Sequence, residues 1–211
     1  MARTILIATR NPGKMAELSL MLDLYVDWLS LADFPDVPEV VEDGRTFEEN
    51  ARKKALSYSK ATGCWTIADD SGLVIDALDG APGVKSERFS GEPQPHEERT
   101  LIDHRNCAKV LELLKDVPAE KRNARFVCSL CLASPAKVLI ETQGRLEGLI
   151  AHNPIGVGGF GYDPVFFVPN PGKTVAQLSP EEKNAISHRG NAIRKLKPLL
   201  GDLLGKQNAD M

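Results

Sequence analysis

Residues 65–75 read WTIADDSGLVI, and this stretch decides how the rest of the chain is interpreted. Trp65–Ala68 is rich in β-forming residues and predicts a strand, while Asp69–Gly72 is typical of a turn at the end of that strand. Two adjacent carboxylates repel each other unless a cation compensates them, and a divalent metal is the usual cation in sites that handle phosphates. By itself the stretch is compatible with a solvated turn and with a metal site.

The composition is that of an ordinary globular protein. The 211 residues suffice for one substantial core, and 42% are hydrophobic while 26% are charged. A net charge of −3 without a basic stripe disfavours nucleic acid as a bulk ligand, although a local pocket can still bind a small charged metabolite. The N-terminus shows no leader pattern and the chain has no apolar run of eighteen residues, so we expect a cytoplasmic protein.

Cys128 and Cys131 have the spacing of a metal-binding or redox pair, but they lie in a strand pattern. Residues three apart on a strand point to opposite faces, and no second pair is present to complete a metal site. We therefore predict buried, reduced cysteines.

The first anion-binding candidate follows the apolar, β-branched run Thr4–Thr9, which predicts a buried strand. Asn11 is a good N-cap and Pro12 suits the first helical position, so a helix begins here. A cation at Lys14, in the first turn, is unfavourable next to the helix dipole unless an anion is bound. The alternative is an ordinary surface lysine.

A second helix is predicted from Thr46, which forms a capping box with Glu49, to about Thr62, with Gly63 as its C-cap. Its apolar stripe is Phe47, Ala51, Ala55 and Tyr58. Asn50 and Lys54 lie four residues apart on a neighbouring face, which is either solvated or turned toward a polar cleft.

The middle of the chain predicts a loop over 92–106 that leads into a helix ending near Lys115. The expected core face of that helix is Leu101, Ala108, Leu111 and Leu114, and we expect His96 and His104 to be solvated. Two strand patterns, at 124–132 and 138–146, are joined by a hairpin signal. Strand–helix units followed by a hairpin predict a mixed α/β sheet with helices on both faces.

A glycine-rich stretch at 156–161 matches the dinucleotide-binding pattern G-x-G-x-x-G, but we reject that function for it. The pattern must open a helix, whereas Tyr162–Val168 predicts a strand. Phe160, flanked by glycines, could stack on a flat heterocycle, or it could be a core aromatic that anchors a turn.

The last motif follows a strong helix start at Ser179. Lys183 and Ser187 share a helical face, and Gly190 predicts a break that lets His188 and Arg189 project from a turn. An amine, an imidazole and a guanidinium are suitable donors to triphosphate oxygens and purine edges.

Taken together, these motifs resemble the inosine triphosphate pyrophosphatase family. The resemblance covers residues 4 to about 197. Its carriers are TRNPGK (9–14), EDGRTFEEN (42–50), ADDSG (68–72), GAPG (80–83), GFGYDP (159–164) and SHRG (187–190).

The resemblance implies a hydrolase that converts ITP, dITP and XTP to the monophosphate and pyrophosphate with Mg²⁺. It implies one α/β domain over residues 1–200, an elongated mixed sheet flanked by helices, with two lobes and the active site in the cleft between them. Residues 201–211 are expected to form a fraying tail, and a homodimer is implied, without nucleic acid or membrane partners.

The resemblance also implies residue roles. Thr9, Asn11 and Lys14 match phosphate contacts, and Lys54 matches a lysine on the phosphate side. Asp70 takes the position of catalytic base and metal ligand, with Asp69 beside it and Glu42 near the metal. The other implied substrate contacts are Ser71, Phe160, Gly161, Tyr162, Asp163, Lys183, His188 and Arg189.

We expect His188 and Arg189 to bond the 6-oxo edge of the base, because a buried group left unpaired by adenine costs about 1–3 kcal/mol. The chain departs from the family at Arg10, where many members carry glycine, and we expect this cation to lie beside the phosphates. The 92–106 segment looks longer than usual, and no substrate contact is expected there. A nucleotide-binding module without catalysis and a phosphatase for small esters are the alternative functions.

Overall fold

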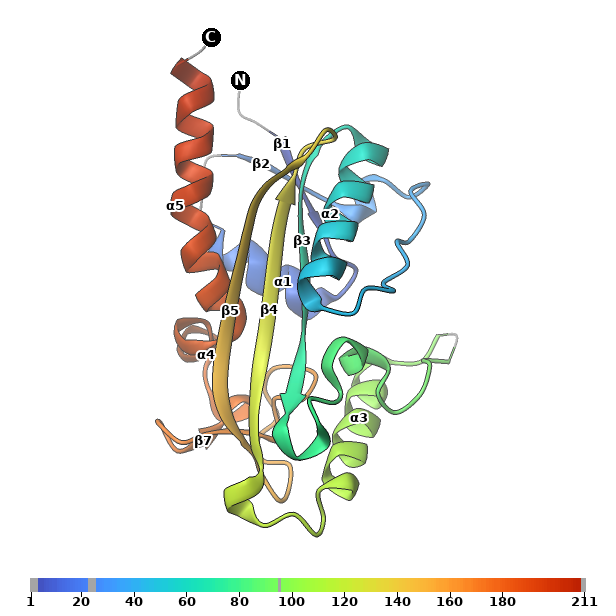
Figure 1. Ribbon diagram of the computed structural model, residues 1–211, viewed down its shortest axis with the longest axis vertical. Helices are drawn as coiled ribbons and strands as arrows, with labels where there is room; N and C mark the ends of the chain where they lie inside the picture. The colour runs from blue at the N-terminus through green and yellow to red at the C-terminus, as the bar shows by residue number, and fades with distance from the viewer. Residues whose placement is uncertain (1–3, 23–25, 95, 210–211) are drawn as a thin grey trace. The chain divides into compact units, whose positions relative to one another are not determined.

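The computed structural model describes residues 4–22, 26–94 and 96–209. The strands are β1 Thr4–Ala8, β2 Asp27–Ser30, β3 Trp65–Ile75, β4 Asn123–Ala133, β5 Val138–Ile150, β6 Phe166–Val168 and β7 Lys173–Thr174. The α-helices are α1 Pro12–Met21, α2 Phe47–Thr62, α3 Arg99–Leu113, α4 Pro180–Ile186 and α5 His188–Ala209 (Figure 1). Across these residues, none of the helices combines the length and the apolar character that crossing a membrane requires.

The strands form one mixed sheet in the order β2-β1-β3-β4-β5-β6-β7, so the predicted α/β class is confirmed. β1 is parallel to both of its neighbours, with Ile5 opposite Trp28 of β2 and Trp65 of β3. β6 is antiparallel to β5 and to β7. The predicted hairpin is also confirmed, because a four-residue turn joins the neighbouring strands β4 and β5 and Ser134 N donates to Lys137 O at 2.9 Å.

The chain divides into two compact units, each with its own core. Unit 1 comprises Met1–Asp70, Cys128–Gly144 and His188–Met211, and unit 2 comprises Ser71–Val127 and Arg145–Ser187. The strands β3, β4 and β5 contribute residues to both units.

In unit 1 the alternation of β1 side chains separates two apolar layers. Ile5 and Ile7 pack with α1 and α5, whereas Leu6 and Ala8 pack with α2. Figure 1 shows α2 on the side of these strands opposite α1 and α5. The same alternation separates Cys128 and Cys131, which belong to different layers, and both cysteines are buried and free as predicted.

In unit 2, β3, β4 and β6 pack against α3, with the rings of Phe126 and Phe166 stacked 4.3 Å apart. The predicted core face of α3 is wrong in part, because Leu101 and Ala108 are exposed. The buried stripe instead repeats every four residues from Ile102 through Asn106 and Val110 to Leu114. His96 and His104 are exposed, as expected.

Local capping signals are mostly confirmed. Gly63 ends α2 with a φ of 73°, and Ser179 forms a complete capping box with Glu182. The box predicted for α2 is only half formed. Thr46 accepts from Glu49 N, but the Glu49 carboxylate accepts from Arg45 N, one residue before the cap.

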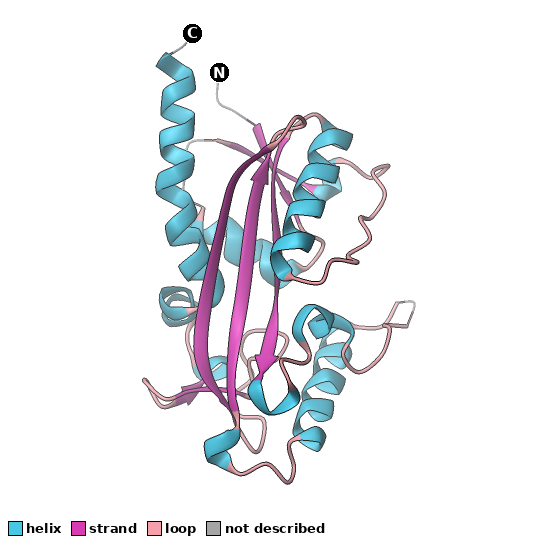
Figure 2. Ribbon diagram, in the orientation of Figure 1, coloured by secondary structure: helices cyan, strands magenta, loops and turns pink. Residues whose placement is uncertain are grey.

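Several predicted boundaries are wrong. Helix α3 begins at Arg99, inside the predicted loop over 92–106. Residues 160–165 form turns, and β6 begins only at Phe166, because Tyr162 O accepts from Phe166 N at 3.1 Å and closes a turn. Residues 201–209 continue α5 (Figure 2) instead of forming a tail, since Leu203 and Leu204 pack against the unit 1 core. Residues 210–211 lie outside the described residues.

Arg122 is a buried cation that holds unit 2 together through carbonyl groups. It is 2% exposed, and its guanidinium donates to Leu114 O (2.6 Å), Val117 O (3.2 Å), Ile150 O (3.4 Å) and Ala151 O (2.8 Å). These bonds join the end of α3 to the end of β5. We expect Arg122→Met to lower the free energy of unfolding by about 2–4 kcal/mol, because several buried carbonyls lose a charged donor.

Urea denaturation of the wild type, of Arg122→Met and of the control Lys121→Met tests this expectation. Lys121 is the exposed neighbour of Arg122 in the chain, so its replacement removes a cation without emptying a buried position. If all three proteins unfold at the same urea concentration, the structural role of Arg122 is contradicted.

Candidate functional site

The loop after β1 lies where a doubly wound sheet binds its ligands. α1 leads from β1 to β2 on one face, and α2 leads from β2 to β3 on the other. The crossovers therefore diverge at the carboxyl end of β1, which is a topological switch point. Residues 9–14 lie at this position.

Side chains of the loop give it a defined shape. The Asn11 carboxamide oxygen accepts from Gly13 N at 2.9 Å and from Lys14 N at 3.2 Å, so the predicted N-cap is confirmed. The Thr9 hydroxyl accepts from Asn11 N at 3.1 Å. The exposed Arg10 donates to Val37 O at 3.4 Å.

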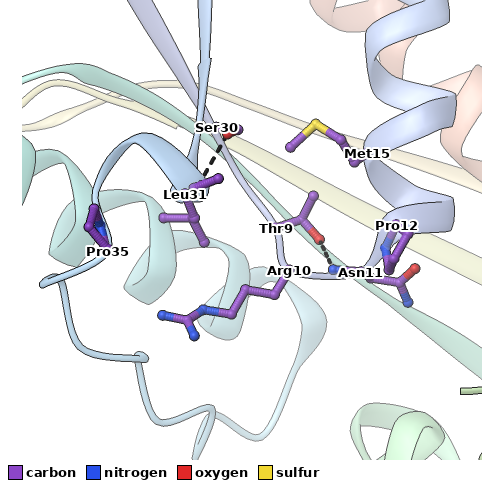
Figure 3. Close-up of a pocket in the computed structure, with 9 residues that line it drawn as sticks. Thr9, Arg10, Asn11, Pro12, Met15, Ser30, Leu31 and Pro35 are labelled. Carbon is purple, nitrogen blue, oxygen red and sulfur yellow. Dashed lines mark hydrogen bonds between the residues drawn. The ribbon is translucent and has the colours of Figure 1, made fainter. Parts of the chain in front are cut away.

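A pocket of about 570 Å³ opens beside this loop (Figure 3). One part of its wall is polar and includes the cation of Arg10, and another part is apolar. The lining residues are Thr9, Arg10, Asn11, Pro12, Met15, Ser30, Leu31, Ala32 and Pro35.

The first acidic cluster surrounds Asp70, whose side chain turns toward α2. Lys54 Nζ donates to Glu42 at 2.8 Å and lies 3.5 Å from Asp70, and Asn50 donates to Asp70 at 3.1 Å. Burial, together with the nearby Glu42 carboxylate and against the opposing effect of the Lys54 ammonium, raises the pKa of Asp70 to about 6. Asn50 and Lys54 are both buried against polar partners, so this helix face is turned toward a polar site and is not solvated.

The second cluster surrounds Asp69, which is 1% exposed. Asp69 pairs with Lys14 Nζ at 2.5 Å and with Arg189 Nε at 2.9 Å, and it accepts from the Cys128 thiol at 3.1 Å. Although burial acts to raise it, the pKa of Asp69 lies well below its usual value because both cations are so close. Arg189 also pairs with Glu17 of α1.

The expected side-by-side placement of the two carboxylates in a turn is corrected by this geometry. β3 runs unbroken from Trp65 to Ile75, so the predicted turn is absent from it. Neighbouring side chains on a strand point to opposite faces, and Asp69 and Asp70 therefore belong to different clusters. Asp69 lies with the α1 and α5 residues, and Asp70 lies with α2.

The expected exposure of His188 and Arg189 is also corrected. The chain breaks at Ser187, whose backbone is extended, and α5 starts at His188 and continues through Gly190. His188 is 7% and Arg189 is 1% exposed. The guanidinium lies in a buried ion network instead of projecting from a turn.

The predicted glycine-rich loop that carries Phe160, called the aromatic loop below and comprising residues 156–163, lies in unit 2, where Phe160 is half-buried. Asp163 accepts from Phe160 N at 2.9 Å and from Lys183 Nζ at 2.5 Å, and Lys183 Nζ lies 4.5 Å from the centre of the Phe160 ring. Gly161 has a φ of 63°, in the left-handed region that favours glycine. Tyr162 and Asp163 are buried, and Ser71 is half-buried in β3.

Some residues of these clusters escaped the sequence reasoning. Glu17 carried no signal, and Cys128 was predicted only as a buried thiol, because each contacts a residue far away in the chain. Asp103 of α3 accepts from Gly161 N at 2.7 Å, a contact that no sequence pattern indicated. Asn50 did carry a local signal, because its spacing of four residues from Lys54 places both side chains on one face of the helix.

The fold and these clusters define an α/β protein with a charged site at the switch point of its sheet. The chain belongs to the Ham1 family, whose model matches residues 5–199. A dITP/XTP pyrophosphatase of Geobacter sulfurreducens is 52% identical over 198 residues, covering 93% of this chain and 96% of the relative. A dITP/XTP pyrophosphatase of Shouchella clausii is 49% identical over 194 residues, covering 92% and 94%.

Solved structures agree with this assignment. A HAM1 protein from Coxiella burnetii superposes with a TM-score of 0.84 at 41% identity, covering 95% of this chain and 99% of the other. A nucleoside-triphosphatase, dITP/XTP pyrophosphatase, from Mycobacterium abscessus has a TM-score of 0.74 at 46% identity, covering 92% and 99%. The resemblance that the sequence motifs indicated is confirmed.

Proposed function

We propose that this protein hydrolyses the non-canonical purine nucleoside triphosphates ITP, dITP and XTP to the nucleoside monophosphate and pyrophosphate. The observation that carries the proposal is the buried Asp70 carboxylate, which shares the Lys54 ammonium with Glu42. Relatives that match nearly the whole chain and are named for this activity support it.

The donor set around Lys54 fits Mg²⁺. Asp70 and Glu42 both reach one ammonium group, so they can also approach one metal ion. Within the ranges that the structure describes, no group of three or more His, Cys, Asp or Glu side chains forms a metal cage. This suits Mg²⁺, which binds through one or two carboxylates and keeps waters and substrate phosphates as its other ligands. When bound, Mg²⁺ would neutralise charge on the triphosphate and acidify a bound water.

Asp70 is the proposed general base. Its carboxylate takes a proton from the attacking water, whose oxygen bonds to the α-phosphorus as the bond to the bridging oxygen breaks and pyrophosphate leaves. A raised pKa suits a base that must accept a proton near neutral pH. Lys54 and Lys14 stabilise the negative charge of the phosphates, and Thr9, Arg10 and Asn11 of the switch-point loop are the other proposed phosphate contacts.

The purine base of the substrate is the proposed ligand of the Phe160 loop in unit 2. The Phe160 ring supplies a face for stacking, and Lys183 with Asp163 holds that ring in place. His188 and Ser71 stay candidate substrate contacts. The cytoplasmic location and the homodimer are further proposals, and light scattering tests the dimer.

The activity is tested by incubating the protein with ITP, dITP, XTP, GTP and ATP and measuring pyrophosphate and orthophosphate. We expect pyrophosphate from the first three, with a kcat/KM at least about 10-fold above that for ATP, because the amino group of adenine leaves buried polar groups unpaired. Excess EDTA is expected to abolish turnover, and added Mg²⁺ to restore it.

Each alternative function has its own outcome in this assay. Orthophosphate as the first product would favour a phosphatase, and a complete lack of turnover would favour a nucleotide-binding module. Full activity in EDTA would remove the metal from the proposal.

A further inference from the structure

Helix α3 holds the aromatic loop through the backbone N–H and the carbonyl oxygen of Gly161. Gly161 N donates to Asp103 Oδ2 at 2.7 Å, and the Cys107 thiol donates to Gly161 O at 3.4 Å. Asp103 and Cys107 are four residues apart, so they share one face of α3. Gly161 is thereby fixed on both sides, although its φ of 63° is one that few residues adopt.

The groups that hold Gly161 are themselves buried and partnered. Asp103 is 7% exposed, and its other oxygen lies 3.2 Å from Arg99 Nε. A buried carboxylate accepting from a backbone N–H forms a short, strong bond. Burial, with the nearby charges of Asp103 and Asp163, raises the pKa of the Cys107 thiol to about 12, so the thiol keeps the proton that it donates.

A second contact fixes the next residue of the loop. The Tyr162 hydroxyl donates to Ser86 O at 2.7 Å. Asn106 of α3 donates to Glu87 O at 3.0 Å and accepts from Ser90 N at 2.8 Å, which ties α3 to the segment that receives Tyr162. The loop therefore rests on α3 directly and through this segment.

We propose that Asp103 is a positioning residue for the purine base, an inference that rests on the proposed function. The N–H that it binds belongs to the peptide between Phe160 and Gly161, so its carboxylate sets the backbone from which the Phe160 ring projects. A ring that is already oriented loses less entropy when the base stacks on it, which strengthens binding. The role falls in the 92–106 segment, where no substrate contact was expected, and Asp103 acts through Gly161 without touching the substrate.

Asp103→Ala tests the proposal through three readouts. We expect the KM for ITP to rise about 10-fold with kcat changed less than about 2-fold, because the base contact is equally strong in the ground and transition states. Amide hydrogen exchange in residues 158–163 is expected to become faster. Inorganic pyrophosphate lacks a base, so its inhibition constant is expected to stay unchanged.

Two further variants serve as rescue and control. Asp103→Asn keeps an oxygen that can accept from Gly161 N, so its KM is expected between those of the wild type and of Asp103→Ala. His104→Ala removes an exposed side chain of the same helix and is expected to match the wild type.

An unchanged KM in Asp103→Ala, whatever its exchange rate, would overturn the positioning role. Parallel increases in KM and in the pyrophosphate inhibition constant would also overturn it, since they indicate a general loss of structure. A wild-type protein without turnover of ITP would instead refute the proposed function itself.

Discussion

Asp70→Asn is expected to lower kcat for ITP hydrolysis by about 10³-fold while leaving the protein folded. The amide has the same shape and can still accept from Asn50, but it cannot take a proton from water, and it binds a metal more weakly than a carboxylate. Asp70 is a buried charge, and burial raises its pKa because the charged form is poorly solvated. Replacing it with a neutral amide removes this desolvation cost. Stability should therefore be retained or slightly increased.

The measurement combines steady-state kinetics with thermal unfolding. Asp76→Asn is a suitable control, because Asp76 is an exposed carboxylate just after β3 that pairs with Arg125 on the surface. It should keep both its activity and its unfolding temperature. More than a tenth of the wild-type kcat in Asp70→Asn would remove Asp70 from the role of base.

Arg189→Met is expected to destabilise the protein by about 3–5 kcal/mol, the usual cost of removing one partner from a buried ion pair. Asp69 would keep Lys14 but lose its second cation, and Glu17 would lose its partner on α5. For a chain of this length such a loss lowers the unfolding temperature by roughly 10 °C.

The prediction is checked by calorimetry or urea denaturation, with Arg194→Met as the control. Arg194 is an exposed arginine on the same helix, where it donates to Asn191. Arg189→Lys keeps one charge and should lose less stability than Arg189→Met. If Arg189→Met is as stable as the wild type but discriminates poorly between ITP and ATP, the base-edge role expected from the sequence is correct.

The two variants also separate the two clusters on β3. Asp70→Asn is expected to change catalysis with little change in stability, and Arg189→Met is expected to change stability first. This contrast follows from the alternation of the strand, which directs Asp70 toward Lys54 and Asp69 toward Arg189.

Features encoded by neighbouring residues were predictable from the sequence. The N-cap at Asn11, the C-cap at Gly63 and the capping box at Ser179 each depend on bonds that span fewer than six residues. The apolar run of β1 and the C-x-x-C alternation follow from the strand period in the same way. The ordered motifs that indicated the family are properties of the sequence as well.

Only the tertiary structure decided what surrounds the charged residues. Residues 69–72 have turn composition, but they continue β3 because the sheet and buried partners override that local preference. Arg189 contacts Asp69 across 120 positions of the chain, and Asp103 contacts Gly161 across 58. Such contacts exist only after α5 and α3 have packed in their units, so no local pattern records them. The sequence determined which charged groups the protein carries, and packing decided which are partners.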